Sequence, residues 1–270
     1  MSELFTVPAG GCSLAAERWS GGAQVVVLLH EGVSDRRGWR EVAGYLPPEV
    51  TVVTYDRRGF GETPPSSEPF SHLADLLAVL DRVADGPAWL VGASAGGGLA
   101  LDTALAAPER VAGLVLLGSA VSGDPDPDLN AAEKRFDALL DQAMESGDPE
   151  EINRLETWAW LDGPAGPEGR VGGPARSLAL DMNAVILRNG VPEDAGESGV
   201  DAWNRLDEVR VPVTVACGDL DFPFLISRNR ELAGRLPQAR YQVLPGMAHQ
   251  PYLEQPRTVA QLVAQALAQD

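Results

Sequence analysis

The sequence predicts an α/β fold with an eight-stranded, mostly parallel sheet flanked by helices. Three observations support this prediction. Short apolar runs alternate with stretches of helical spacing, several of the runs are apolar throughout, and the alternation stops at about residue 120 and resumes after Val209. Alternating strands and helices favour a parallel sheet with right-handed crossovers. A strand buried on both faces has a continuous apolar sequence.

The first 120 residues supply six of the eight predicted strands. Residues 4–7 and 12–19 flank Ala9-Gly10-Gly11 and predict an opening hairpin. Apolar residues at helical spacing predict helices over 39–46 and 73–83, and Ser71 is placed to cap the second helix. The other four strands are predicted at 24–29, 50–55, 88–91 and 113–117.

Residues 121–200 break this pattern, because they are rich in Gly, Pro and acidic residues. Phe136 to Ala143 predicts one amphipathic helix, and Asp148 followed by Pro149 predicts the start of another. Two strands (212–216 and 240–244) and two helices (228–236 and 259–266) are predicted beyond them. We therefore expect a core of residues 1–120 and 201–270, with residues 121–200 inserted after the sixth strand as a helical cap.

The composition excludes several classes of partner. A net charge of −18 argues against nucleic acid and anionic membranes as partners. Cys12 and Cys217 are far apart, and the three histidines show no metal-binding spacing, so we expect no metal and no other cofactor. The amino terminus lacks the basic and apolar segments of a signal peptide, which predicts a cytoplasmic protein. The expected partner is a small-molecule substrate, which the motifs described below imply. The oligomeric state cannot be inferred from the sequence.

The most informative stretch is Gly92-Ala93-Ser94-Ala95-Gly96, which lies between a predicted strand and a predicted helix. In this context the pattern Gly-x-Ser-x-Gly places a nucleophilic serine on a sharp, strained turn. Side chains at Gly92 and Gly96 would collide where the strand and the helix cross. A glycine-rich turn that binds phosphate, or that merely packs closely, is the alternative interpretation.

A serine hydroxyl needs a base, and an imidazole needs a carboxylate behind it. His249 follows the eighth predicted strand, and Asp219 and Asp221 both follow the seventh. These loops lie at the sheet edge where open parallel sheets bind ligands. Either aspartate is a candidate at this point.

With these motifs the chain resembles the α/β-hydrolase family over essentially its whole length. The matching segments are His30-Glu31-Gly32, the loop from Tyr55 to Gly61, the Gly92–Gly96 turn, Gly218 to Asp221, and His249 to Pro256. The resemblance implies Ser94 as nucleophile, His249 as base and Asp221 as acid, in the chain order of the family. Asp219 is the competing acid, and Asp124 occupies another position that the family uses.

The resemblance also implies the donors of an oxyanion hole. The backbone N–H of Ala95 is one donor, and that of Gly32, two residues beyond His30, is the other. Glu31 departs from the family, which usually has glycine there. Glu31 either turns to solvent or places its charge near the pocket, where it disfavours anionic substrates. His30 itself is interpreted as structural.

The expected activity is that of a carboxylesterase-like serine hydrolase acting on a small, apolar ester or related carbonyl compound through an acyl-enzyme. Trp158 and Met182 are the candidate pocket residues, and Trp160 and Trp203 are further candidates. The alternative role for all four is to pack the cap onto the core. A cofactor-free haloperoxidase (perhydrolase) or a carbon–carbon bond hydrolase could use the same triad. A non-enzymatic ligand-binding member of the fold remains a third possibility.

Overall fold

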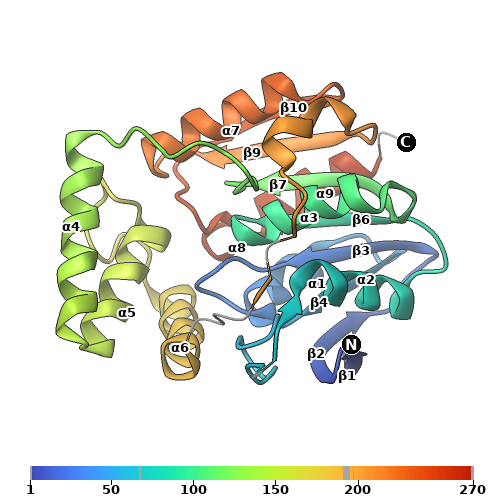
Figure 1. The fold of residues 1–270 in the computed structure, drawn as a ribbon, viewed down its shortest axis with the longest axis horizontal. Coiled ribbons are helices and arrows are strands. Elements are labelled where there is room, and N and C mark those ends of the chain that lie inside the picture. Colours follow the sequence, from blue (N-terminus) through green and yellow to red (C-terminus); the bar gives the residue numbers. More distant parts are fainter. Residues whose placement is uncertain (1, 67, 191–194, 197, 269–270) are drawn as a thin grey trace.

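The computed structural model describes residues 2–66, 68–190, 195–196 and 198–268. One eight-stranded sheet forms the centre of the molecule, with the strand order β1-β2-β4-β3-β6-β7-β9-β10 (Figure 1). Its strands are β1 (Ser2–Ala9), β2 (Cys12–Trp19), β3 (Gln24–Leu29), β4 (Val50–Tyr55), β6 (Ala88–Ala93), β7 (Val111–Leu117), β9 (Val213–Gly218) and β10 (Ala239–Leu244). The prediction of an eight-stranded sheet is confirmed.

The sheet is parallel except at one edge. β1 pairs antiparallel with β2, and β2 pairs antiparallel with β4. The other neighbouring pairs are parallel. The interior strands β6 and β9, each paired on both sides, are buried along their whole length, which explains their continuous apolar sequences. The fold class predicted from the sequence is confirmed.

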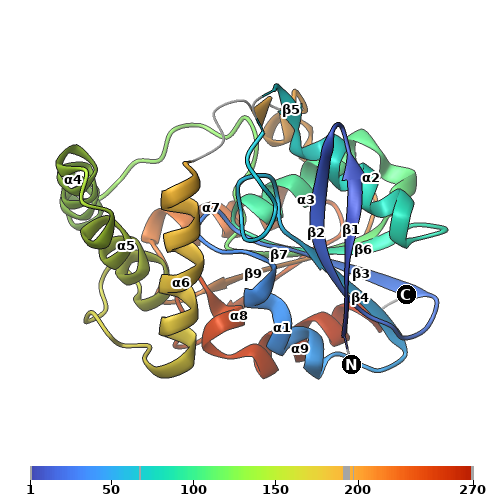
Figure 2. The same ribbon diagram turned by 90° about the horizontal axis from the view of Figure 1, so that it is seen from below.

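Helices cover both faces of the sheet (Figure 2). The core on one face includes residues of α2 (His72–Val83), α3 (Ala95–Ala106) and α7 (Pro223–Arg235). The core on the other face includes residues of α1 (Arg40–Tyr45), α8 (Pro251–Glu254) and α9 (Pro256–Leu267). The Ser71 side chain caps α2 as predicted. The helix predicted from Arg228 begins earlier, at Pro223.

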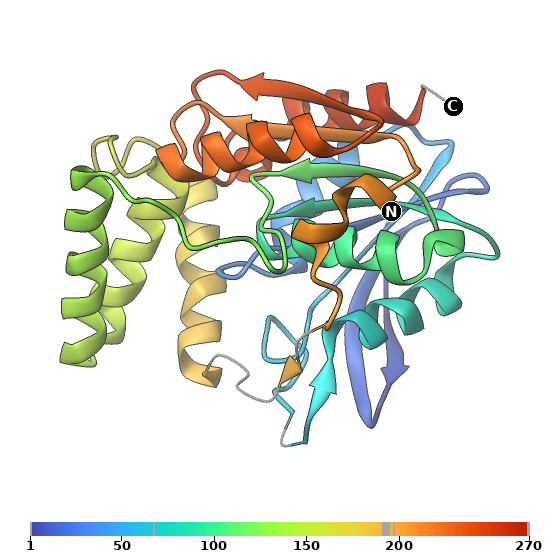
Figure 3. The ribbon, with the colours of Figure 1, turned by 45° about the horizontal axis from the view of Figure 1, so that its top comes forward.

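The segment between β7 and β9 contains α4 (Ala131–Ser146), α5 (Pro149–Thr157), a π-helical turn (Trp158–Asp162) and α6 (Gly173–Asn189). Figure 3 shows these helices beside the sheet, at the end toward which β7 runs. Asp148 caps α5, as predicted. α6 was not predicted from the sequence; its buried face mixes apolar residues with Asn183. A short parallel pair, β5 (Phe70–Ser71) with β8 (Ala195–Gly196), was also not predicted.

Within the described part of the chain, none of the helices combines the length and apolar character that crossing a membrane requires.

Candidate active site

Ser94 lies on the turn between β6 and α3 and has a φ of 48°. It is one of two non-glycine residues with positive φ among the described residues, the other being Asp201. Such a conformation is strained for a residue with a Cβ, and strain of this kind is concentrated at functional sites. The Ser94 N–H donates to the carbonyl of Leu117 (2.9 Å), and the Ser94 carbonyl accepts from the N–H of Ala120 (3.1 Å). The neighbouring loop therefore holds the strained turn on both sides.

Gly92 and Gly96 are required by close backbone contacts, as the sequence predicts. A Cβ on Gly92 would overlap the main chain of Gly96, and a Cβ on Gly96 would overlap the carbonyl of Leu29 at the end of β3. The turn therefore packs backbone against backbone, and no side chain fits at either position.

His249 and Asp221 form a buried hydrogen-bonded pair. Nδ1 of His249 lies 2.8 Å from Oδ2 of Asp221, and both side chains are almost inaccessible to solvent. The other carboxylate oxygen, Oδ1, accepts the N–H of Phe222 (2.7 Å), and the Cys217 thiol donates to Oδ2 (3.6 Å). The Asp221 carboxylate is thus oriented by its own loop, and it holds Nδ1 of the ring.

The turn that follows β7 approaches both Ser94 and this pair. A Cβ on Gly118 would lie 3.0 Å from Nδ1 of His249 and 3.2 Å from Oδ2 of Asp221. The residues that bind the Ser94 backbone are Leu117, directly before Gly118, and Ala120, two residues after it. Among the described residues none makes a hydrogen bond with the Ser94 hydroxyl, which is partly accessible.

The other two candidate acids face elsewhere. Asp219 is exposed, and its Oδ1 accepts the N–H of Gly246 (2.6 Å). Asp124 forms an ion pair with Arg228. Asp221 is therefore the candidate acid whose carboxylate contacts the His249 ring.

Glu31 does not turn to solvent, so the first of the two sequence-based alternatives is wrong. Its side chain is buried (1% exposed), and Oε1 accepts hydrogen bonds from the hydroxyl of Tyr252 (2.8 Å) and the amide of Gln250. Oε2 lies 3.7 Å from Nε2 of His249. Burial raises the pKa of Glu31, although His249, Tyr252 and Gln250 oppose this shift.

The charge balance around His249 favours the imidazolium. Burial lowers the pKa of His249, but Asp221 and Glu31 have the larger combined effect and raise the pKa to about 8. A histidine with this pKa is a stronger base than a free imidazole, but it is mostly protonated at pH 7.

His30 has a structural role, because both of its ring nitrogens are occupied. Nδ1 lies 2.7 Å from the carbonyl of Glu31, and Nε2 accepts the N–H of Arg57 (3.0 Å). Burial and the Arg57 charge hold the pKa of His30 well below its usual value, so the ring is neutral. These bonds fix the loop that carries Gly32. A Cβ on Gly32 would meet open space, and Ala95 is the first residue of α3, where helix N–H groups lack partners within the helix.

An apolar hollow of about 290 Å³ is next to this site. Among its lining residues are Phe136 and Leu140 of α4, Trp160, Phe222 and Phe224. The Trp160 ring lies 4.7 Å from the His249 ring and 4.9 Å from the Phe222 ring, between centroids. Phe222 was not singled out from the sequence, although its position directly after Asp221 was a usable signal.

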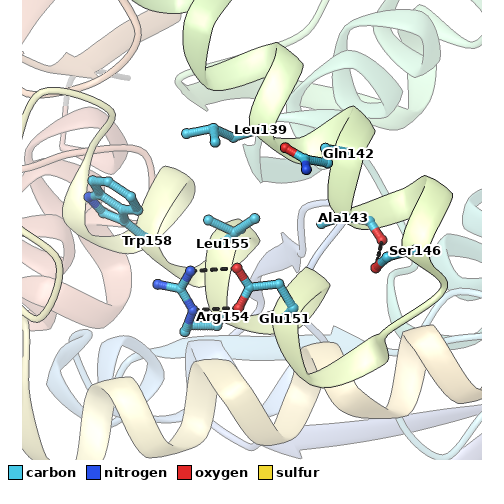
Figure 4. A pocket seen from close by; sticks show the side chains of 8 residues that line it. All are labelled: Leu139, Gln142, Ala143, Ser146, Glu151, Arg154, Leu155 and Trp158. Carbon is cyan, nitrogen blue, oxygen red and sulfur yellow. Dashed lines mark hydrogen bonds and ion pairs between the residues drawn. The ribbon is translucent and has the colours of Figure 1, made fainter.

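The two pocket residues named from the sequence lie elsewhere. Met182 is fully buried in the core that also contains Trp39 and Tyr252. Trp158 lines a different hollow of about 420 Å³, between α4 and α5 (Figure 4). Its Nε1 donates to the carbonyl of Gly166 (3.0 Å). Ser94, Asp221 and His249 line neither hollow, but Trp160 of the first hollow packs against the His249 ring. Trp203 packs in the core beneath α3, away from both hollows.

Comparisons with known proteins agree with this architecture. The family model described as "alpha/beta hydrolase fold" matches residues 24–256. The chain is 27% identical, over 97% of both chains, to a Bacillus subtilis protein named as a putative 2-succinyl-6-hydroxy-2,4-cyclohexadiene-1-carboxylate synthase. It is 33% identical to Lipase LipV of Mycobacterium tuberculosis over 66% of this chain and 64% of that one. A thermophilic esterase from Thermogutta terrifontis has the same fold, with a TM-score of 0.74, 24% identity and 98% of both chains covered. The chain belongs to the alpha/beta hydrolase fold family.

Proposed function

We propose that this chain is a cofactor-independent serine hydrolase that cleaves an ester, or a related carbonyl compound, of a small apolar molecule. The observation that carries the proposal is the 2.8 Å contact between Nδ1 of His249 and Oδ2 of Asp221, together with a serine at positive φ on a turn at the same edge of the sheet. An imidazole held by a carboxylate is the group that removes the proton of a serine hydroxyl in such a triad.

In the proposed reaction, Oγ of Ser94 attacks the carbonyl carbon while Nε2 of His249 takes the hydroxyl proton. The N–H groups of Ala95 and Gly32 donate hydrogen bonds to the oxyanion of the tetrahedral intermediate. His249 then protonates the departing alcohol, and the acyl group remains on Ser94. Water, deprotonated by His249, releases the acid and restores the serine. Asp221 holds the ring tautomer throughout and stabilises the imidazolium.

The proposal for an apolar substrate rests on the hollow lined by Trp160 and Phe222. Two acids lie in its wall. Both carboxylate oxygens of the buried Glu133 accept main-chain N–H groups, from Phe224 and Asn130, and Asp137 is exposed to solvent. The remaining wall offers aromatic and aliphatic contacts to an acyl chain or an alcohol. Residues 121–200 are accordingly proposed to form the cap that determines the substrate.

The proposed substrate is also uncharged. Glu31 places a buried carboxylate beside the reacting groups, which opposes a second negative charge there. p-Nitrophenyl esters of acyl chains from acetyl to decanoyl, with a monosuccinyl ester as the anionic counterpart, measure both preferences. Faster turnover of the monosuccinyl ester than of the butyryl ester would contradict this part of the proposal.

Ser94→Ala is the principal test of the mechanism. We expect a loss of about 10³-fold or more in kcat/KM with folding intact, because no other hydroxyl can form the acyl-enzyme. Asp221→Asn should lose a comparable factor, since an amide cannot hold the required tautomer. Asp219→Asn is the matched control and should retain activity. Unchanged ester hydrolysis by folded Ser94→Ala would defeat the proposal.

Two further measurements separate the alternative activities. A fluorophosphonate probe should label the wild-type protein at Ser94, whereas a non-enzymatic ligand-binding protein should not react. Peroxide-dependent bromination in acetate buffer, faster than ester hydrolysis, would assign the triad to a perhydrolase.

A further inference from the structure

The His249 ring lies between two buried carboxylates. Asp221 contacts Nδ1 at 2.8 Å, and Glu31 approaches Nε2 to 3.7 Å from a loop more than 200 residues before His249 in the chain. In the proposed reaction Nε2 is the atom that takes the serine proton. A second carboxylate on this side of the ring therefore acts on the reacting nitrogen itself.

Glu31 is held in this position by a network of buried groups. Tyr252 and Gln250 occupy Oε1, and the Tyr252 hydroxyl also lies 2.9 Å from Oγ of Ser34. The main-chain carbonyl of Glu31 accepts a bond from the Arg57 guanidinium (2.7 Å). Oε2 is buried and has no hydrogen-bond partner among the described residues. The nearest cationic group that the structure records for Oε2 is the His249 ring.

Few other charges act on this ring. The charged groups recorded as influencing His249 are Asp221 and Glu31. Arg57 acts on Glu31 from the loop after β4. The thiol of Cys217 donates to Asp221, and its pKa is raised far above the usual value by burial, so it is neutral. The Trp160 ring, which is uncharged, packs against the His249 ring from the inserted segment.

We propose that Glu31 is a positioning residue that holds His249 as an imidazolium, so that the resting site is a row of carboxylate, imidazolium and carboxylate. This inference rests on the proposed role of His249 as the base. A carboxylate within about 4–6 Å of an imidazole favours its charged form, and burial reduces the screening of that attraction by water. Three donors, from Tyr252, Gln250 and Arg57, hold Glu31 where this attraction operates.

The row makes the activity depend on alkaline conditions. An imidazolium cannot accept the Ser94 proton, so His249 must first lose its own proton. The pKa of His249 is raised to about 8, and the fraction of active enzyme therefore increases as the pH rises through 8. Removing the Glu31 charge removes one of the two carboxylates that favour the imidazolium. The midpoint of the acid limb of the kcat/KM profile should therefore move to a lower pH.

Glu31→Gln tests the inference, because the amide keeps the size of the side chain and an acceptor for Tyr252 but removes the charge. We expect the acid limb of the kcat/KM profile to move down by about one pH unit. At pH 6.5 this raises kcat/KM, relative to the plateau of each enzyme, by about tenfold. Asp219→Asn removes one carboxylate from the same edge of the sheet and should leave the limb in place.

The second readout is independent of catalysis. The 15N NMR signals of the imidazole rings report protonation directly, and the chain has three histidines. The pKa values of His30 and His72 are lowered, to about 3 for His72, so the signal that titrates near pH 8 belongs to His249. This pKa should fall in Glu31→Gln by the same amount as the acid limb moves.

If Glu31→Gln does not fold, Tyr252→Phe serves instead, because it removes a donor that keeps Glu31 ionised and should move the limb by a smaller amount in the same direction. An unchanged His249 pKa in the folded variant overturns the inference. If Ser94→Ala is inactive at the same time, the proposed function stands and only the role of Glu31 is refuted.

Discussion

The two sides of the site are held by different kinds of contact. On the sheet side, the Ser94 turn rests on backbone groups packed so closely that no side chain fits at Gly92 or Gly96. On the side of the inserted segment, rings pack against rings, with Trp160 against His249 and Phe222. One main-chain bond, from the His249 N–H to the Trp160 carbonyl (3.2 Å), joins the two sides.

The two kinds of contact differ in how well they tolerate substitutions. Backbone contacts at their closest approach accept no added atom, and their disruption moves the reacting groups. Ring contacts tolerate exchange of one apolar group for another at a modest cost. We therefore expect changes on the sheet side to abolish activity, and changes on the inserted segment to alter which substrate is accepted.

The largest effect should come from Gly96→Ala. The added methyl overlaps the Leu29 carbonyl, so the end of β3 or the start of α3 must shift, at a cost of about 3 kcal/mol in the free energy of unfolding. The same shift displaces Ser94, and esterase activity should fall below detection. Urea unfolding and p-nitrophenyl butyrate hydrolysis measure the two effects.

Gly44→Ala is the control for that change. Gly44 lies exposed in α1, where a Cβ would have no neighbour within 4 Å, so alanine should preserve activity and slightly increase stability. Equal losses of activity and stability in Gly96→Ala and Gly44→Ala would show that the turn does not require glycine at position 96.

An intermediate effect is expected from Trp160→Ala. The ring forms part of the apolar hollow and touches His249, so its removal should raise KM for the octanoyl ester by about tenfold and affect the acetyl ester less. Trp158→Ala is the matched control. It faces the hollow between α4 and α5, and we expect an unchanged KM with a loss of about 2 kcal/mol in stability. A raised KM in Trp158→Ala with an unchanged KM in Trp160→Ala would place the substrate in the hollow of Figure 4.

The same contrast explains how far the sequence could predict this site. The Ser94 turn was predictable because its Gly-x-Ser-x-Gly pattern is local in the chain, although the carbonyl that excludes a side chain at Gly96 belongs to Leu29 of β3. The position of Glu31 was not, because it depends on Tyr252 and Gln250, more than 200 residues away. The sequence showed only that Glu31 departs from the family pattern, and left open whether it faced solvent or the pocket.

The inserted segment was less predictable than the sheet for a related reason. α4 and α5 carry local signals, a cluster of apolar residues and an Asp148 cap. α6 also carries local signals that were not used, because Pro174 lies in its first turn and Ala179, Met182 and Ile186 recur at helical spacing. Its buried face also includes Asn183. Asn183 is satisfied by hydrogen bonds to Asn153 and Glu156 of α5, which no local pattern reveals. Met182 was predicted to line a pocket, but α6 packs this side chain into the core.

The smallest effect should come from Arg154→Ala. Arg154 forms a two-point ion pair with Glu151 and a further contact with Glu168, yet its side chain is 41% exposed (Figure 4). Exposed pairs of this kind contribute little, because water already solvates both charges and ordering the side chains costs entropy. We expect the thermal midpoint and kcat/KM to remain within experimental error. A loss of stability as large as that of Trp158→Ala would show that ion pairs, and not ring packing, hold the inserted segment together.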